Sequence, residues 1–486
     1  MLLLPPFKNN SVYLWVAIFL FRLIYHTGNM FHKVLFTVLF LCFFTIIAQA
    51  QVTGTITTNN SAHSLSNDIS NKPLSLNDCI SFALKSQPAI NQAYLDEAIA
   101  KSNNKIAWSG WLPQVTGSAN YTNYFQLPTS FTRVNGVLTP IQSGVKITSI
   151  PAVTANQTIF NPEVMLATKA AKLNTQQAKL GTDAVKINLV ADVSKAFYNL
   201  LLSIAHTGVY REDTARLKKN QMDALNRYKS GIADKVDYKQ ATISLNNSLS
   251  QLKTASETVF ARYAQLKQVM GYTGENNFDV AFDTSLMLRE IYTDTLTTLQ
   301  IEKRIEYQQL KNLKQIQKES TNYYKLAWLP SLSAFYSYNQ AFQNNKFGDL
   351  YSKAYPYSLF GLQLNIPLFT GFRRVENLHK AHLQEQRTNW DEVNLKLAIY
   401  AQYKQAIATY KSNLYYLQTQ AENKDMAREV YNIVKLQYSM GIKPYLDVII
   451  AESQLQTAEI NYLNSLYQLL ASKIDLEKAM GTITTL

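Results

Sequence analysis

Two kinds of hydrophobic pattern alternate along this chain. From residue 161 to 229, and again from 370 to 439, apolar residues recur through long stretches with few glycines or prolines. Helices of this length exceed those of ordinary globular domains and favour coiled-coil packing. Shorter stretches alternate apolar and polar residues, as half-buried strands do. These predicted strands lie near residues 112–125, 145–160, 329–343 and 356–369.

The sequence contains one structural unit twice. The sequence WLPQVTGSANY begins at Trp111, and WLPSLSAFYSY begins at Trp328, each following a helical pattern and opening an alternating one. Further matched segments recur at an offset of about 210 residues, which indicates a duplication. Each unit reads helix, strand, loop, strand, very long helix, glycine-marked break, long helix. We therefore predict two repeats, residues 73–271 and 300–486, joined by a segment at 272–299 that packs beside the helices.

The first 50 residues are typical of an exported protein. An apolar run from 34 to 47 follows Lys33 and precedes Ala48-Gln49-Ala50, which predicts a signal peptide cleaved before Gln51, with Met30 as an alternative start. The run is shorter than the roughly 18 residues that span a bilayer. The polar segment at 51–72 is predicted to be disordered. Cys79 would be the one cysteine of the mature chain, which excludes an internal disulfide.

The alternating stretches suit a transmembrane β-barrel, because they are about ten residues long and rich in aromatic residues. An ordinary half-solvated hairpin is the alternative interpretation. Four strands cannot close a barrel around a channel, since an open edge in lipid leaves backbone groups unpaired. The strands must then be pooled among several chains. The residues predicted to face lipid are Leu332, Tyr336, Phe360, Leu362, Leu364 and Ile366.

Charge and motifs argue against nucleic acid as a partner and against an enzyme. The formal net charge is +13, but the basic residues are scattered among acids along helical stretches, as on a solvated face. Sequence motifs for phosphate binding, nucleophilic serines and zinc hydrolases do not occur. Glu376, His379, His382 and Glu385 recur every three residues, yet this spacing drifts around a helix and cannot bring all four to one ion. We expect no catalytic residue, cofactor or metal.

Residues 74–486 resemble the TolC-like outer-membrane efflux protein family. The resemblance rests on PLSLNDCISFALKSQPAI, the two WLP segments, LNIPLFTGFRR, YKSGIADKVDYKQA, YSMGIKPYLDVIIAESQL and AMGTI, in this order and at this spacing. It implies a membrane α+β protein: a homotrimer with a 12-stranded outer-membrane barrel, continued by a periplasmic coiled-coil barrel. It also implies an exit duct of a tripartite efflux or type I secretion system. Such a duct passively conducts substrates from an inner-membrane pump and its periplasmic adaptor.

The resemblance also implies functional residues at the two helical tips. Gly231 and Gly441 follow long helices, where a left-handed C-cap is usual, and a pure turn role is the alternative for both. The family would place adaptor contacts at Lys229, Ser230, Gly231, Ile232, Ser439, Met440, Gly441 and Ile442. It would place the periplasmic entrance at Lys443, Tyr445, Asp447 and Ile450. Asp447 matches the first acidic position of that entrance and Lys443 its basic neighbour, whereas Ile450 stands at the second acidic position.

An exported coiled-coil scaffold or adhesin without a channel is the competing hypothesis. It would explain the long helices but not the paired alternating segments. The alternative to a role of Asp447 at the entrance is that it is a solvated helix residue.

Overall fold

A computed structural model describes residues 73–134, 136–274, 278–281, 287, 291 and 299–483 of the chain. These residues lie in one compact unit, Ser66–Leu486. The predicted signal peptide and the segment at 51–72 fall outside the described residues, as does most of the inter-repeat segment. Of that segment, Phe278, Met287 and Ile291 are buried in the main hydrophobic core.

The first repeat begins with two helices, α3 (Leu76–Ser86) and α4 (Pro88–Ser109). Ser75 and Asp78 form a reciprocal capping box at the start of α3. Strands β1 (Gln114–Asn123) and β4 (Ile147–Phe160) follow, and then the long helices α5 (Pro162–Lys229) and α6 (Lys235–Met270). At 68 residues, α5 extends roughly 100 Å. Asn161 starts α5 by accepting a hydrogen bond from the backbone N–H of Glu163.

The second repeat has the same order of elements. The short 3-10 helix η3 (Ile301–Lys303) leads into α8 (Ile305–Leu326), which is followed by β5 (Ser331–Asn344), β6 (Ala354–Asn365), α9 (Arg373–Ser439) and α10 (Tyr445–Met480). In both repeats a Trp-Leu-Pro sequence separates the last helical turn from the first strand, because proline cannot donate the hydrogen bond that would continue the helix.

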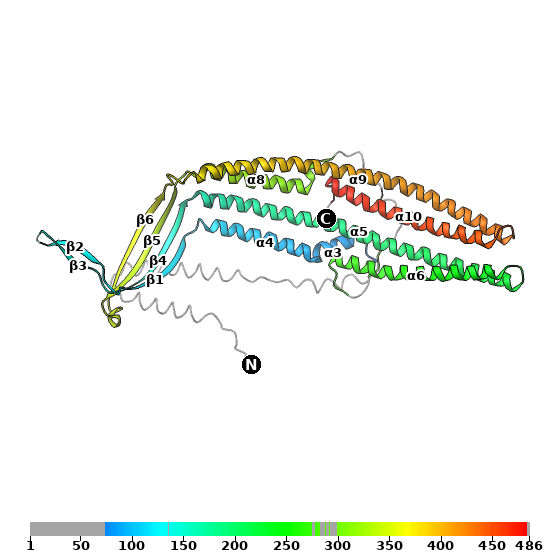
Figure 1. The fold of residues 1–486 in the computed structure, drawn as a ribbon, viewed down its shortest axis with the longest axis horizontal. Coiled ribbons are helices and arrows are strands. Elements are labelled where there is room, and N and C mark those ends of the chain that lie inside the picture. The colour runs from blue at the N-terminus through cyan, green and yellow to red at the C-terminus, as the bar shows by residue number, and fades with distance from the viewer. Residues whose placement is uncertain are drawn as a thin grey trace. The chain divides into compact units, whose positions relative to one another are not determined.

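The four main strands form one antiparallel sheet in the order β1-β4-β5-β6. Directly paired residues share a face, and the register pairs Leu332 with Leu364, Ala334 with Leu362 and Tyr336 with Phe360. Most apolar residues of β5 and β6 therefore lie on one face, and serines and amides predominate on the other, which also carries Phe335 and Leu359. Figure 1 shows the four strands as one continuous layer. Neither β1 nor β6 has a further strand beside it in the described part of the chain.

Two details of this sheet differ from the prediction made from the sequence. Ile366 was predicted to lie in a strand, but β6 ends at Asn365, which pairs with the first residue of β5. Pro367 follows Ile366 and has no N–H group with which to extend the ladder. The connection between β1 and β4 was predicted to be a loop, but it carries a separate hairpin. Its strands are β2 (Thr129–Val134) and β3 (Val137–Gln142).

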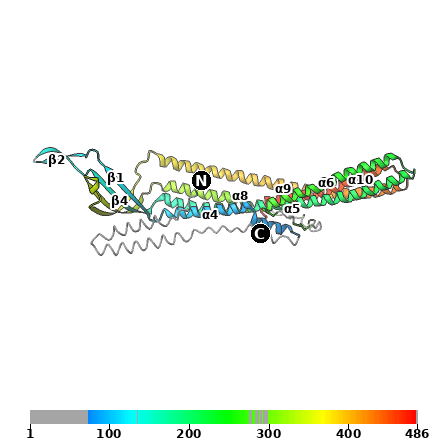
Figure 2. The ribbon, with the colours of Figure 1, turned by 90° about the horizontal axis from the view of Figure 1, so that it is seen from below.

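The helices form a row and two hairpins. Helix α4 packs against α5, α5 against α8, and α8 against α9, so that four helices lie side by side in this order (Figure 1). Helices α5 and α6 form one long hairpin and α9 and α10 form the other, and the two hairpins run alongside each other with α10 against α5 (Figure 2). Among the described residues, α5 alone contains a stretch long and apolar enough to cross a membrane, but that stretch is mostly buried in the protein.

Candidate functional site

The turns between the paired helices are built alike. Gly231 and Gly441 both adopt the left-handed conformation, with φ of 73° and 76°. In each turn the next residue donates its N–H to a carbonyl five positions back: Ile232 to Arg227, and Ile442 to Gln437, both at 2.9 Å. This is the Schellman arrangement, which satisfies the last carbonyls of a helix. The C-cap role predicted for both glycines is confirmed.

All eight residues predicted at the tips are exposed. The apolar ones are the most unusual, because Ile232, Met440 and Ile442 are each at least 63% exposed at the ends of their hairpins. The tips therefore offer small apolar surfaces surrounded by polar residues.

The residues after the second tip begin α10. Pro444 occupies the N-cap position, and the Nζ of Lys443 lies 3.2 Å from Oδ2 of Asp447 one turn later. Both side chains are more than one third exposed, so this ion pair is solvated and contributes little to stability. Ile450 is also exposed. Lys443, just before α10, and Asp447 and Ile450 of α10 therefore lie at the protein surface.

Tyr445 does not share this surface. Although we predicted it at the entrance, its side chain is 1% exposed and packs among apolar residues of α5, α9 and α10. The ring of Tyr438 lies 5.4 Å away, and burial raises the pKa of the Tyr445 hydroxyl. Tyr445 therefore supports the tip from inside.

Arg227 joins the two tips. Its Nη2 donates to the backbone carbonyl of Ser439 at 3.3 Å, and its guanidinium lies 4.8 Å from the centre of the Tyr438 ring. Arg227 stands near the end of α5, and both partners belong to the other hairpin. This contact couples the positions of the two turns.

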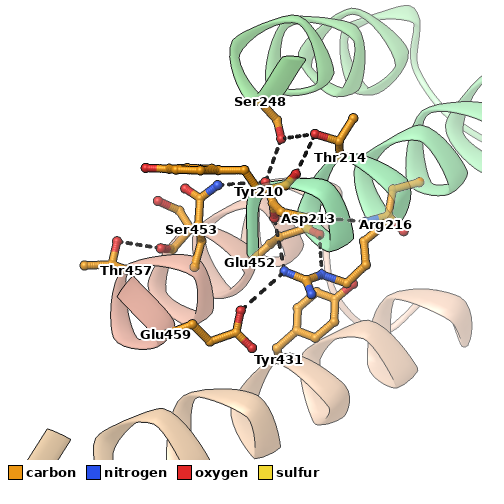
Figure 3. A network of polar contacts seen from close by, with 12 residues as sticks. Tyr210, Asp213, Thr214, Arg216, Ser248, Tyr431, Glu452, Ser453, Thr457 and Glu459 are labelled. Atoms are coloured by element: carbon orange, nitrogen blue, oxygen red, sulfur yellow. Dashed lines mark hydrogen bonds and ion pairs between the residues drawn. The ribbon is translucent and has the colours of Figure 1, made fainter. Parts of the chain in front are cut away.

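A buried charged network lies further along the same hairpins, and Figure 3 shows Arg216 at its centre. We name it the Arg216 cluster: Asp213, Arg216 and Asn220 of α5, and Glu452 and Glu459 of α10, with Arg428 of α9 at its rim. The guanidinium of Arg216 lies 3.1 Å from Asp213, 3.5 Å from Glu452 and 3.9 Å from Glu459. All three carboxylates are buried. The cluster thus bridges α5 and α10.

Burial shifts the pKa of two of these acids upward. Desolvation, and then the charge of Asp213, raise the pKa of Glu452 to about 7. Desolvation also raises the pKa of Asp213, although hydrogen bonding by Ser248 and the charge of Arg216 oppose the shift. Both acids accept hydrogen bonds from amides as well: Glu452 from Asn220 at 3.0 Å, and Asp213 from Gln456 at 2.7 Å.

Arg227 and the Arg216 cluster were not predicted from the sequence. A signal for the cluster was present, because Glu452 and Glu459 lie seven residues apart between Val448, Leu455 and Leu466. Charged residues at heptad core positions are unusual and call for a partner. No comparable pattern marks Arg227.

Comparisons with known proteins agree with this architecture. Residues 79–272 and 308–482 match the model of the outer membrane efflux protein family. The outer membrane protein TolC of Escherichia coli is 20% identical over 429 residues, covering 82% of this chain and 80% of that protein. TolC of Vibrio cholerae is 20% identical over 355 residues, covering 68% of this chain and 76% of that protein.

Solved structures share the fold. The crystal structure of CusC superimposes with a TM-score of 0.68 at 16% identity, covering 83% of this chain and 91% of that one. The family match spans both repeats and includes both helical tips. The chain belongs to the outer membrane efflux protein family, and it is an efflux duct of the outer membrane and not an enzyme.

Proposed function

We propose that three copies of this chain close head to tail into one duct, with a 12-stranded barrel in the outer membrane and a helical tunnel in the periplasm. The observation that supports this most is the pair of open edges on the four-stranded sheet, β1 at one side and β6 at the other. Open edges in lipid leave backbone groups unpaired, whereas pairing β6 of one copy with β1 of the next satisfies both. Such a contact joins two different surfaces and closes into a ring.

The helical row supports the same arrangement. Its two end helices, α4 and α9, carry exposed apolar side chains at coiled-coil spacing. On α9 these are Leu383, Trp390, Val393, Leu397 and Tyr400, and on α4 they are Leu95, Ile99 and Ile106. Exposed apolar seams of this kind require a partner helix. Packing α9 of one copy against α4 of the next covers both seams and follows the same head-to-tail direction as the sheet.

The apolar face of the sheet is proposed to contact lipid. Its members include Leu332, Tyr336, Phe360, Leu362 and Leu364, and the last three are each more than half exposed. The opposite face carries Ser331, Ser333, Ser337, Gln363 and Asn365, which suits a water-filled interior.

Replacing Leu364 with arginine tests this assignment of the two faces. We expect a loss of about 2–4 kcal/mol in barrel stability if Leu364 lies near the bilayer midplane, because the charge would enter hydrocarbon. Gln363→Arg, on the opposite face of the same strand, is the matched control and should be tolerated. Folding yields of the two variants in lipid vesicles would measure the difference. Equal folding yields of the two variants would contradict the assignment of Leu364 to the lipid-facing side of the sheet.

The tips are proposed as the periplasmic end of the duct. The exposed residues of both turns, from Lys229 to Ile232 and from Ser439 to Ile442, would contact a periplasmic adaptor that links the duct to an inner-membrane pump. Their exposed isoleucines and Met440 would supply the apolar centre of that contact. Lys443, Asp447 and Ile450 would lie at the entrance, where the symmetry axis brings three copies of Asp447 together.

Conductance in planar bilayers tests the proposed function. Wild-type protein should form cation-preferring channels, and a trivalent cation on the periplasmic side should block them by binding between the three Asp447 carboxylates. Asp447→Asn should weaken this block several-fold and leave the channels assembled, because the side chain is solvated. Asp475→Asn, about 40 Å further along α10, is the matched control. The trivalent cation should block its channels as strongly as it blocks wild-type channels. Equal block in all three proteins would exclude an entrance at Asp447.

A further inference from the structure

The Arg216 cluster holds more buried acid than its bases can neutralise. Asp213, Glu452 and Glu459 are all buried, and in the described part of the chain Arg216 is the one base within ion-pair distance of all three. Arg428 reaches Glu459 at 2.8 Å, but its side chain is 56% exposed to solvent. Counting both arginines, three carboxylates face two positive charges, which leaves one negative charge in excess.

The surrounding charges do not remove this excess. Helix α9 contributes Lys435, which acts on Glu452 from a distance and donates to the hydroxyl of Tyr431 at 3.1 Å. Glu212 of α5 and Asp425 of α9 lie near Arg428 and add negative charge at the rim, where Lys424 pairs with Asp425 at 3.4 Å. The buried hydroxyl of Tyr445 also faces Glu452 and is neutral, because burial raises its pKa. Helix α6 presents the neutral Ser248, which donates to Asp213 at 2.8 Å.

The buried carboxylates of the cluster are incompletely paired. Among the described residues, Oε2 of Glu459 is buried without a hydrogen-bond partner, and Oε1 of Glu452 faces Nε of Arg216 at 3.5 Å without forming a hydrogen bond. A buried acceptor without a donor is costly, and so is a buried charge without full compensation. A proton on Glu452 removes the excess charge. Its other oxygen still accepts from Asn220.

We propose that the Arg216 cluster is a proton-binding site, centred on Glu452, which ties the α9–α10 hairpin to the α5–α6 hairpin when the proton is bound. Asp213, Arg216 and Asn220 stand on α5, whereas Glu452 and Glu459 stand on α10, so the site is complete only while the hairpins are in contact. Loss of the proton leaves uncompensated negative charge between them and favours their separation.

The direction of the pH effect follows from the pKa of Glu452. Its value of about 7 in the folded protein lies above the ordinary value near 4.5. Stability from this group is therefore fully present below the unfolded-state pKa and is lost as pH rises through about 7. Between about pH 6 and about pH 8, the equilibrium constant for keeping the hairpins together should fall about tenfold per chain.

The position of the cluster links this proton to the duct. Glu452 follows Asp447 by five residues on α10, which is about 7.5 Å along the helix axis. Separation of the hairpins at the cluster would shift Asp447 and the second tip together. This step rests on the proposed function, in which Asp447 lines the entrance.

Glu452→Gln is the decisive variant, because glutamine keeps the shape and the bond to Asn220 but cannot ionise. Infrared difference spectra of the assembled wild-type protein, recorded between about pH 6 and about pH 8, should show the carbonyl band of one protonated carboxylic acid disappearing. The band should be absent from Glu452→Gln. The midpoint of thermal unfolding of wild type should fall over the same range, and Glu452→Gln should remove most of that slope. Asp475→Asn is the control, because Asp475 is a half-exposed carboxylate on the same helix. This variant should keep both the infrared band and the pH dependence of the unfolding midpoint.

The outcomes separate this proposal from the proposed function. If the band is missing in wild type, or if Glu452→Gln keeps the full slope of the unfolding midpoint, the proton-binding site is wrong. Channel conductance should also rise as pH passes about 7 in wild type and stay low in Glu452→Gln. A third outcome is that the infrared and unfolding results match the prediction while the conductance does not change with pH. That combination would contradict the entrance at Asp447 and leave the proton-binding site supported.

Discussion

Gly271→Ala is expected to destabilise the protein severely. Gly271 ends α6 with φ of 69°, and a Cβ atom there would lie 2.7 Å from the backbone Cα of Gln87. Gln87 joins α3 to α4, and its side chain donates to the carbonyl of Val269 at 2.9 Å, so neither backbone can move freely. Left-handed strain of about 1–2 kcal/mol and overpacking of about 1–3 kcal/mol should add, giving a loss of about 2–5 kcal/mol.

Gly441→Ala is the matched control for this prediction. Gly441 has nearly the same conformation, with φ of 76°, but a Cβ atom there would meet nothing within 4 Å. The loss should therefore be the strain alone, about 1–2 kcal/mol. Unfolding midpoints of the two variants in detergent would measure the difference. Equal losses would mean that the contact between α6 and the α3–α4 junction does not constrain the fold.

The glycine positions illustrate which parts of the fold the sequence could predict. Val269-Met270-Gly271 and Ala479-Met480-Gly481 recur in the two repeats, and both glycines end a helix in the left-handed conformation. Local chemistry is sufficient for such positions, since glycine alone adopts this backbone without strain. The alternation of apolar and polar residues likewise predicted all four main strands, because the period of a strand is a local property.

Features that depend on distant partners could not be predicted in this way. The hairpin of β2 and β3 contains Pro140, which disfavours a strand, and its pairing within the loop left no clear alternation. Tyr445 occupies the first turn of α10, where the sequence does not distinguish an outward position from one covered by α5 and α9. Arg216 meets Glu452 across more than 200 residues of sequence, and only the packing of the hairpins brings them together.

Arg216→Met should be the most damaging single substitution in the Arg216 cluster. Methionine keeps much of the apolar stem but removes the guanidinium that contacts Asp213, Glu452 and Glu459. Breaking a buried ion pair by removing one partner typically costs about 3–5 kcal/mol, because the remaining charge stays buried. We expect a loss of this size at neutral pH, measured as the change in unfolding midpoint of the assembled protein.

The loss in Arg216→Met should also depend on pH, which distinguishes lost charge from lost packing. The charge of Arg216 lowers the pKa of Asp213 and of Glu452, so its removal raises both further above their ordinary values. The variant should therefore be least impaired in acid and increasingly impaired as pH rises, since each acid must lose its proton while buried. Lys253→Met is the control, because Lys253 and its partner Glu257 are both more than half exposed, and it should cost about 1 kcal/mol or less. A loss in Arg216→Met that is the same at every pH would assign Arg216 a packing role and remove the electrostatic link between the two hairpins.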